Sequence, residues 1–335
     1  MALFPKAFVA SVVFAMSGIG SDASAEDALK ALVTWDALEV VSDRPEVIER
    51  VDSILAGEGF TPGMRMSAAD SRIGHYCTRL ESVFGQGAVQ CHPILQGGGT
   101  AILVVQFDEG FPARRSQEIP GCSVGAQLPS EAQDALSRWQ DLVIQKLQVS
   151  GGDPMSLTEF VNNDHYLDYR DVGLHEAASA LHKAVATEFD VIAVSSRACE
   201  PRVRSHAVAM LNYSGRPQDA LNLAIARIAD PDEEVRNESL RLTSTFSSYM
   251  TPDSRSEMVD VYCHLLRSPS FFDRNKSLAG LSAIFSENPS SVAKIDPSCL
   301  DLIRTAAVLS RSEQIGGYAR DIVRTAVHSS RLSNP

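Results

Sequence analysis

A short pattern that recurs in the C-terminal half of the chain restricts the fold more than any other sequence feature. Arg236 and Arg274 each begin the pattern Arg-Asn-x-Ser-Leu, and the two copies lie 38 residues apart (274 − 236). A related start at Arg204 precedes Arg236 by 32 residues (236 − 204), and a degenerate fourth copy is predicted at Arg320. A repeat period of about 20–50 residues is typical of proteins built from stacked units of secondary structure.

Apolar residues lie beside or after each of the three clear starts, and these positions are expected to face a common core. They are Val203, Ala207 and Leu211, then Val235, Leu240 and Leu242, and then Leu278, Leu281 and Ile284. The sequence therefore predicts an all-α domain of packed helix pairs over residues 172–330.

The segment Asp230-Pro231-Asp232-Glu233-Glu234-Val235-Arg236-Asn237 resembles the start of the second helix of a HEAT repeat, the Asp-x-x-x-Val-Arg pattern of helical solenoids. Its acidic residues would lie at a helix N-terminus, where negative charge is favoured. The resemblance implies that Arg204, Arg236 and Arg274 form a stacked ladder that reaches a carboxylate or a carbonyl of the neighbouring turn. It also implies an extended surface for a partner.

The first residues have the layout of an export signal. Lys6 precedes an apolar run over residues 7–19, which is shorter than the roughly 20 residues that span a bilayer. Ala23-Ser24-Ala25 fits a cleavage site, so residues 1–25 are predicted to be removed before Glu26. An uncleaved anchor is the alternative. We expect an exported protein without a membrane span, in the periplasm or, alternatively, outside the cell.

The six cysteines all follow the predicted signal, and an oxidising compartment permits disulfides. Cys77 with Cys91 is the first predicted pair, and Cys263 with Cys299 is the second; free buried thiols are the alternative. No Cys-x-x-Cys or Cys-x-x-His pair exists to form a tetrahedral zinc site, so no structural metal is expected.

Residues 26–110 are predicted to form a small α+β domain. A strand near residues 35–41 is followed by helices around residues 47–55 and 73–84, and then by strands at 88–95 and 101–107 joined by Gln96-Gly97-Gly98-Gly99. The order β-α-α-β-β, with Phe84-Gly85 before the final hairpin, resembles the POTRA module of envelope assembly proteins. That resemblance implies an exposed sheet edge for a partner strand; a small α+β domain of another family is the alternative.

Residues 111–171 are predicted to form a connector with one helix, which starts near Ser130. Its second half holds a polar cluster that could bind a metal or a sugar, although a hydrogen-bonded loop is the simpler interpretation. The cluster includes Asp164, His165 and Asp168, and His175 lies a few residues beyond the connector.

The chain carries 30 Lys and Arg against 42 Asp and Glu, a net charge of −12, which disfavours nucleic acid and anionic lipid as general partners. No Gly-x-Ser-x-Gly, P-loop or His-Glu-x-x-His motif is present, and no cofactor is expected. The sequence favours a non-catalytic adaptor that binds a protein partner in the cell envelope. Its expected partner-binding residues are Arg204, Arg236, Asn237, Arg274 and Asn275.

Two other functions remain open from the sequence. The first is a hydrolase or lyase of an envelope polymer that uses the polar cluster at residues 163–175. It requires Asp164, His165, Asp168 and His175 to share one pocket. The second is a purely structural envelope component without a specific partner.

Overall fold

A computed structural model describes residues 32–42, 44–67, 70–96, 100–107, 121–149 and 159–332. The predicted signal peptide, residues 1–25, lies outside this range. The chain divides into two compact units. Among the described residues, the first holds 32–94, 101–107 and 243–332 and is here called the sheet unit. The second holds 95–96, 100, 121–149 and 159–242 and is here called the hairpin unit.

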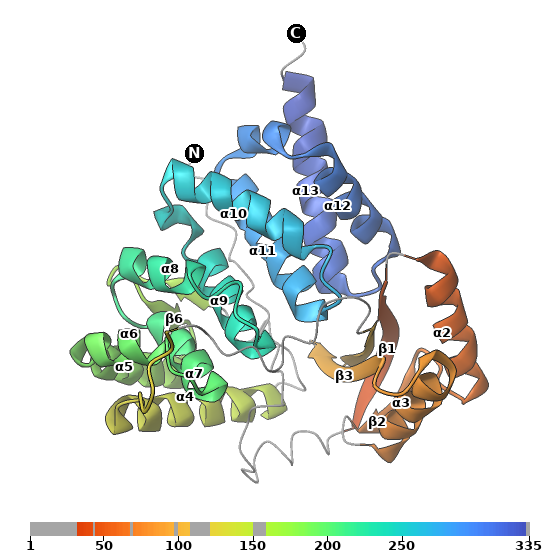
Figure 1. The fold of residues 1–335 in the computed structure, drawn as a ribbon, viewed down its shortest axis with the longest axis horizontal. Coiled ribbons are helices and arrows are strands. Elements are labelled where there is room, and N and C mark those ends of the chain that lie inside the picture. Colours follow the sequence, from red (N-terminus) through yellow and green to blue (C-terminus); the bar gives the residue numbers. More distant parts are fainter. Residues whose placement is uncertain are drawn as a thin grey trace. The chain divides into compact units, whose positions relative to one another are not determined.

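The N-terminal part of the sheet unit is a four-stranded sheet with two helices (Figure 1). Its elements are β1 (Leu32–Val41), α2 (Pro45–Gly57), β2 (Met64–Ser67), α3 (Ser71–Phe84), β3 (Val89–Gln96) and β4 (Thr100–Phe107). The strand order is β2-β1-β4-β3. The predicted order of strand, helix, helix and two strands is confirmed, with one addition. The short strand β2 lies between the helices and pairs antiparallel with β1, with Trp35 opposite Met64.

Local sequence signals set the ends of both helices. Pro45 is the first residue of α2, a position where the missing N–H of proline costs no helical hydrogen bond. Asp70 caps α3 by accepting a hydrogen bond from the backbone N–H of Arg72. Gly85 ends α3 with a φ of 116°, which is easily adopted only by glycine.

Apolar residues of α2, α3 and β1 form the core beneath the sheet. Val51, Leu55 and Leu80 are fully buried, as is the ring of Trp35. The indole N–H of Trp35 donates to the carbonyl of Met66 at 3.1 Å, so the largest side chain of this core has its polar atom satisfied.

The C-terminal helices of the sheet unit extend this core. They are α10 (Pro252–Leu265), α11 (Phe271–Glu287), α12 (Pro297–Leu309) and α13 (Glu313–Leu332), with the 3-10 turns η4 (Ser247–Tyr249) and η5 (Pro289–Lys294). β4 is buried from Ala101 to Phe107, as its continuous apolar run favours for a strand covered on both faces. The buried side chain of Gln106 on β4 accepts a hydrogen bond from the N–H of Phe271, the first residue of α11.

The hairpin unit is mostly helical and begins with a helix and a two-stranded hairpin. Its elements are α4 (Ser130–Val149), β5 (Glu159–Val161), β6 (Leu167–Tyr169), α5 (Val172–Thr187), α6 (Phe189–Ser195), α7 (Pro201–Leu211), α8 (Pro217–Ile225) and α9 (Glu233–Thr245). The last three residues of α9, 243–245, belong to the sheet unit.

The two units divide the chain differently from the boundaries expected from the sequence. Helices α5 to α8 belong to the hairpin unit and α10 to α13 to the sheet unit, so the expected repeat domain at residues 172–330 is shared between them. The expected connector at residues 111–171 contributes core to the hairpin unit, because α4 packs against α5. Its apolar face, including Leu136, Trp139 and Val143, is buried there.

All six cysteines are paired. Cys77–Cys91 and Cys263–Cys299 form the two disulfides predicted from the sequence, and Cys122–Cys199 is a third. Three disulfides fit an exported protein, because such bonds persist in oxidising compartments. Across the described residues, no helix combines the length and the apolar character that a bilayer crossing requires.

Candidate functional site

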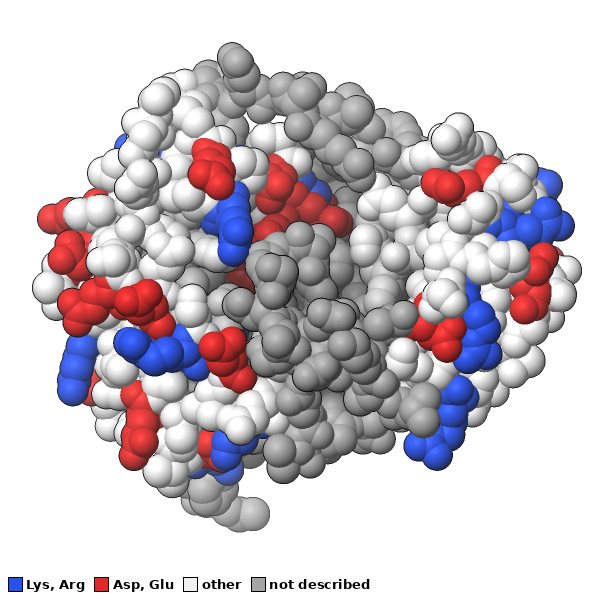
Figure 2. All heavy atoms as spheres, turned by 90° about the horizontal axis from the view of Figure 1, so that it is seen from below, with Lys and Arg blue, Asp and Glu red and all other residues white. Residues whose placement is uncertain are grey.

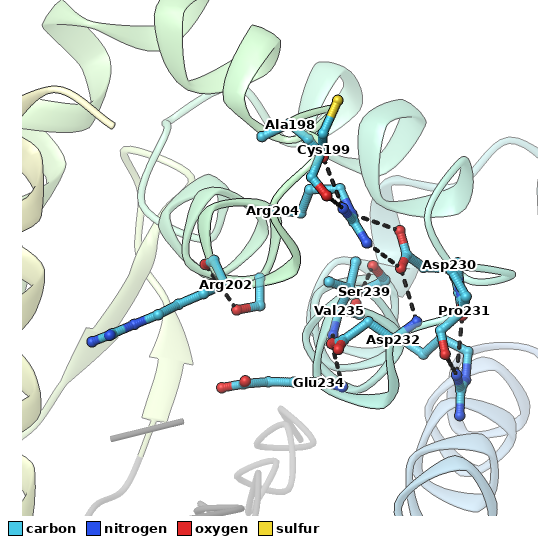
Figure 3. A network of polar contacts seen from close by, with 12 residues as sticks. Ala198, Cys199, Arg202, Arg204, Asp230, Pro231, Asp232, Glu234, Val235 and Ser239 are labelled. Carbon is cyan, nitrogen blue, oxygen red and sulfur yellow. Dashed lines mark hydrogen bonds and ion pairs between the residues drawn. The ribbon is translucent and has the colours of Figure 1, made fainter. Parts of the chain in front are cut away.

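The predicted ladder arginine Arg204 lies at the centre of a polar network at the start of α7 (Figure 3). Its guanidinium donates to both carboxylate oxygens of Asp230, at 3.0 and 2.9 Å. A third nitrogen donates to the carbonyls of Ala198 and Cys199 at 2.8 and 2.9 Å. The side chains of Arg204 and Asp230 are almost fully buried, at 2% and 1% exposure. The opposite charge and the hydrogen bonds of the partner replace the hydration that each ion loses on burial.

The same arginine geometry recurs at two further helix starts. Arg204, Arg236 and Arg274 are each the fourth residue of their helix, α7, α9 and α11. Each donates to the carbonyl six residues earlier: Ala198 for Arg204, Asp230 for Arg236 at 3.0 Å, and Ser268 for Arg274 at 2.6 Å. This is the kind of contact expected of the three arginines from the sequence. Arg320 differs, because it lies further into α13 and pairs with the carboxylate of Glu313.

Burial corrects the role predicted for these residues. Arg204, Arg236, Asn237 and Asn275 are all buried, and only Arg274 is partly exposed. A partner cannot reach a guanidinium that is enclosed by the carbonyls and carboxylate of its own chain. The four buried residues are therefore not exposed for contact with a partner.

The start of α9 carries the acidic residues that the repeat pattern placed there. Asp232 caps the helix, since its carboxylate accepts from the N–H groups of Glu234 and Val235, both at 3.1 Å. Burial, together with the charges of Glu238 and Asp232, raises the pKa of Glu234 to about 7.

The structure joins two members of the predicted polar cluster. Asp168 is 3% exposed, and its carboxylate oxygens lie 2.8 and 3.0 Å from Nδ1 of His175. The side-chain amide of Asn162 donates to the same carboxylate at 3.0 Å. The imidazole of His175 is 53% exposed, so its second nitrogen is accessible to solvent.

The other two members lie at the tip of the hairpin. Asp164 and His165 are exposed, in a turn that is closed by a hydrogen bond from the N–H of His165 to the carbonyl of Asn162. The φ of His165 is 61°, a left-handed conformation that few residues other than glycine adopt. Among the described residues, no group of three or more potential metal ligands is brought together.

A buried network next to this hairpin was not foreseen from the sequence. Glu159 accepts from Arg241 at 2.7 Å and from the hydroxyl of Tyr169 at 3.1 Å, and Tyr169 also contacts the hydroxyl of Tyr213 at 3.2 Å. Burial and the charge of Glu159 raise the pKa of Tyr169. The three pairs of partners lie 82, 10 and 44 residues apart in the sequence. Helical or strand periodicity cannot predict contacts at such separations.

Charges on the surface are mixed. Figure 2 shows one face of the molecule, on which the acidic and basic side chains of the described residues are interspersed. The described residues of that face form no extended basic area of the kind that binds nucleic acid.

Comparisons of the chain with protein-family models, with curated proteins and with solved structures gave no match.

Proposed function

We propose that the protein is an exported, non-catalytic adaptor of the cell envelope, located in the periplasm, that binds a protein partner through a surface of helical repeats. The expected signal peptide before Glu26 and the three disulfides support export.

The observation that carries this proposal is the recurrence of one arginine geometry in α7, α9 and α11. In each case an arginine at the fourth helical position ties the first turn of its helix to a carbonyl six residues earlier in the chain. A recurring contact of this kind favours a repeated helix-pair unit, and stacked repeat units present extended binding surfaces. The geometry thus supports the HEAT-like interpretation of the sequence.

The exposed side chains of α8 in the hairpin unit and those of α10 in the sheet unit are two separate candidates for a contact surface, because α9 and α11 are largely buried. On α10, Glu257, Asp260 and His264 are exposed at spacings of three and four and share one helix face. On α8, Asn222 is exposed.

The sheet supplies a second support. β3 is an edge strand of the four-stranded sheet and contains Pro93, a residue that is tolerated in strands mainly at edges. An edge strand can accept a strand from a partner, as the POTRA-like order of elements implies.

Position-specific photo-crosslinking in living cells tests the proposal. A photoreactive amino acid is placed at Asn222, Glu257, Asp260 or His264, with Asp301 on α12 as the exposed control position. The adaptor function predicts one crosslinked species of a single mass from adjacent α10 positions and none from Asp301. Products of scattered mass, or no product from any position in a fully exported protein, would contradict it.

A further inference from the structure

The outward face of the β5–β6 hairpin combines an exposed aromatic ring with an ordered polar group. Phe160 on β5 is directly opposite Asp168 on β6, and opposite residues of an antiparallel pair project to the same face. Phe160 is 41% exposed, which is unusual for a phenylalanine in a hairpin whose other face is buried. That other face carries Glu159 and Tyr169, each 2% exposed.

The polar groups beside Phe160 are held in fixed positions. The carboxylate of Asp168 accepts from the amide of Asn162, lies 2.8 Å from Nδ1 of His175, and accepts from the backbone N–H of Tyr169. These contacts leave the second ring nitrogen of His175 as the group that faces solvent. An imidazole whose ring is oriented by a buried carboxylate presents that nitrogen at a defined angle.

The turn at the tip of the hairpin packs against the helices of the same unit. The ring of Tyr166 stacks on His182 with 4.2 Å between centroids and 10° between planes, and Nδ1 of His182 lies 2.7 Å from the carbonyl of Tyr213. The turn closes against Gly215, where an added Cβ would lie 2.9 Å from His182 and 3.3 Å from the carbonyl of Asp164. The tip residues Asp164 and His165 therefore project from a fixed platform.

We infer that this face of the hairpin, formed by Phe160, Asn162, Asp168 and His175, is a binding site for a carbohydrate chain. A pyranose ring has one face of C–H groups, which packs against an aromatic ring, and a rim of hydroxyls, which pairs with fixed donors and acceptors. An exposed phenylalanine offers the first, and Asp168 on the same hairpin face, whose carboxylate holds the imidazole of His175 and the amide of Asn162, offers the second. The site goes beyond the proposed adaptor function, since it lies on another element and requires no protein partner.

Calorimetric titration of the mature protein with the soluble β-linked oligosaccharides chitohexaose and cellohexaose tests this site. We expect at least one of the two sugars to bind. Phe160→Leu removes the aromatic face but keeps an apolar side chain, and it should weaken binding by about tenfold or more. His175→Ala should weaken it similarly, whereas Phe160→Tyr keeps the ring and should bind as the wild type does.

The matched control is Val194→Ala on α6, an exposed apolar side chain of the same unit at 54% exposure. It should leave the affinity for the sugar unchanged, and circular dichroism checks that all variants are folded. Binding of neither sugar by the folded wild-type protein would overturn the inference. So would undiminished binding by Phe160→Leu, because the aromatic face would then have no role. Neither outcome bears on crosslinking from α8 and α10, so failure of the sugar site and failure of the adaptor function are distinguishable.

Discussion

Glu39 on β1 accepts hydrogen bonds from the backbone N–H groups of Arg311 and Ser312, residues that lie 272 and 273 positions later in the chain. The distances are 2.7 and 3.0 Å, and the hydroxyl of Ser310 donates to the other carboxylate oxygen at 2.9 Å. The guanidinium of Arg311 also forms a bidentate pair with Asp52 at 2.8 and 2.6 Å. A carboxylate of the sheet thus holds the segment that leads into α13, within the sheet unit.

This relationship predicts a pH dependence of stability. Burial raises the pKa of Glu39 above its usual 4.5, although the three donors oppose the shift. A raised pKa in the folded state means that the contribution of Glu39 to stability is fully present below pH 4.5 and is lost as the pH rises through the raised value. Glu39→Gln keeps a carbonyl for the two N–H groups and an amide for Ser310 but has no charge. Its stability relative to the wild type should therefore increase from pH 4.5 to pH 8.

Urea unfolding of both proteins across this pH range measures the effect. Glu49→Gln on the exposed side of α2 controls for the loss of a surface carboxylate. A difference between Glu39→Gln and the wild type that stays constant with pH would contradict the prediction.

The buried pair of Arg204 and Asp230 predicts a large loss on removal of one partner. Arg204→Met leaves the carboxylate of Asp230 buried without its cation, which typically costs about 3–5 kcal/mol in the free energy of unfolding. Arg304→Met breaks a pair with Asp301 whose side chains are 59% and 71% exposed, and should cost at most about 0.5 kcal/mol. Denaturant titrations compare the two. In a double-mutant cycle, Asp230→Asn should recover part of the loss in the Arg204→Met background, and equal losses for both arginines would argue against the network.

Helices α10 and α11 pack so closely at Gly280 that a side chain at this position has no room. A Cβ at this position would overlap the ring of Tyr262, which is fully buried and cannot move aside freely. Gly280→Ala should therefore destabilise the protein by about 1–3 kcal/mol, despite the better helix propensity of alanine. Gly317→Ala in α13 is the matched control, because no atom lies within 4 Å of its added Cβ. It should stabilise by up to about 1 kcal/mol, and thermal melts that rank the two variants in the opposite order would refute this account.

The Cys77–Cys91 and Cys122–Cys199 disulfides should contribute different amounts to the free energy of unfolding, because they close loops of different length. Loop-closure entropy predicts a loss of about 3 kcal/mol for serine replacement of the Cys77–Cys91 pair, with 14 residues of separation. The loss for the Cys122–Cys199 pair, with a separation of 77 residues, should be about 4.5 kcal/mol. Mass spectrometry of unreduced peptides checks the connectivity, and denaturant titration of each double-serine variant checks the order.

Much of the secondary structure of the N-terminal domain could be predicted from the sequence. Alternation and helical spacing predicted the order of elements around β1, α2, α3, β3 and β4, but β2 was missed. A strand of four residues between two turns has too little sequence to show a period. Two disulfides were predicted from spacing in an exported chain; the third, Cys122–Cys199, joins segments that no local pattern relates.

The candidate sites show the same division. The repeated pattern identified Arg204, Arg236 and Arg274 as equivalent, and the structure gives them equivalent carbonyl contacts. Their burial could not be read from the pattern, because a polar helix face looks the same in sequence whether water or another element covers it. The polar run at residues 163–175 identified the region of the hairpin as a candidate site, but it did not identify Phe160. The pairing of β5 with β6 places Phe160 opposite Asp168, and this pairing is not evident from the sequence.

The sequence by itself determined the longer helices and strands of the N-terminal domain, the helical character of the C-terminal half and which arginines recur, since these features depend on residues within about one or two turns of each other. Only the tertiary structure decided that the C-terminal helices share a unit with the N-terminal sheet, that Glu39 and Gln106 bind helix starts, and that the ladder arginines are enclosed. The contacts of Gln106 and Glu39 join residues 165 to 273 positions apart. Their formation depends on which surfaces bury the most apolar area together, a property of the packed chain that no short stretch of sequence contains.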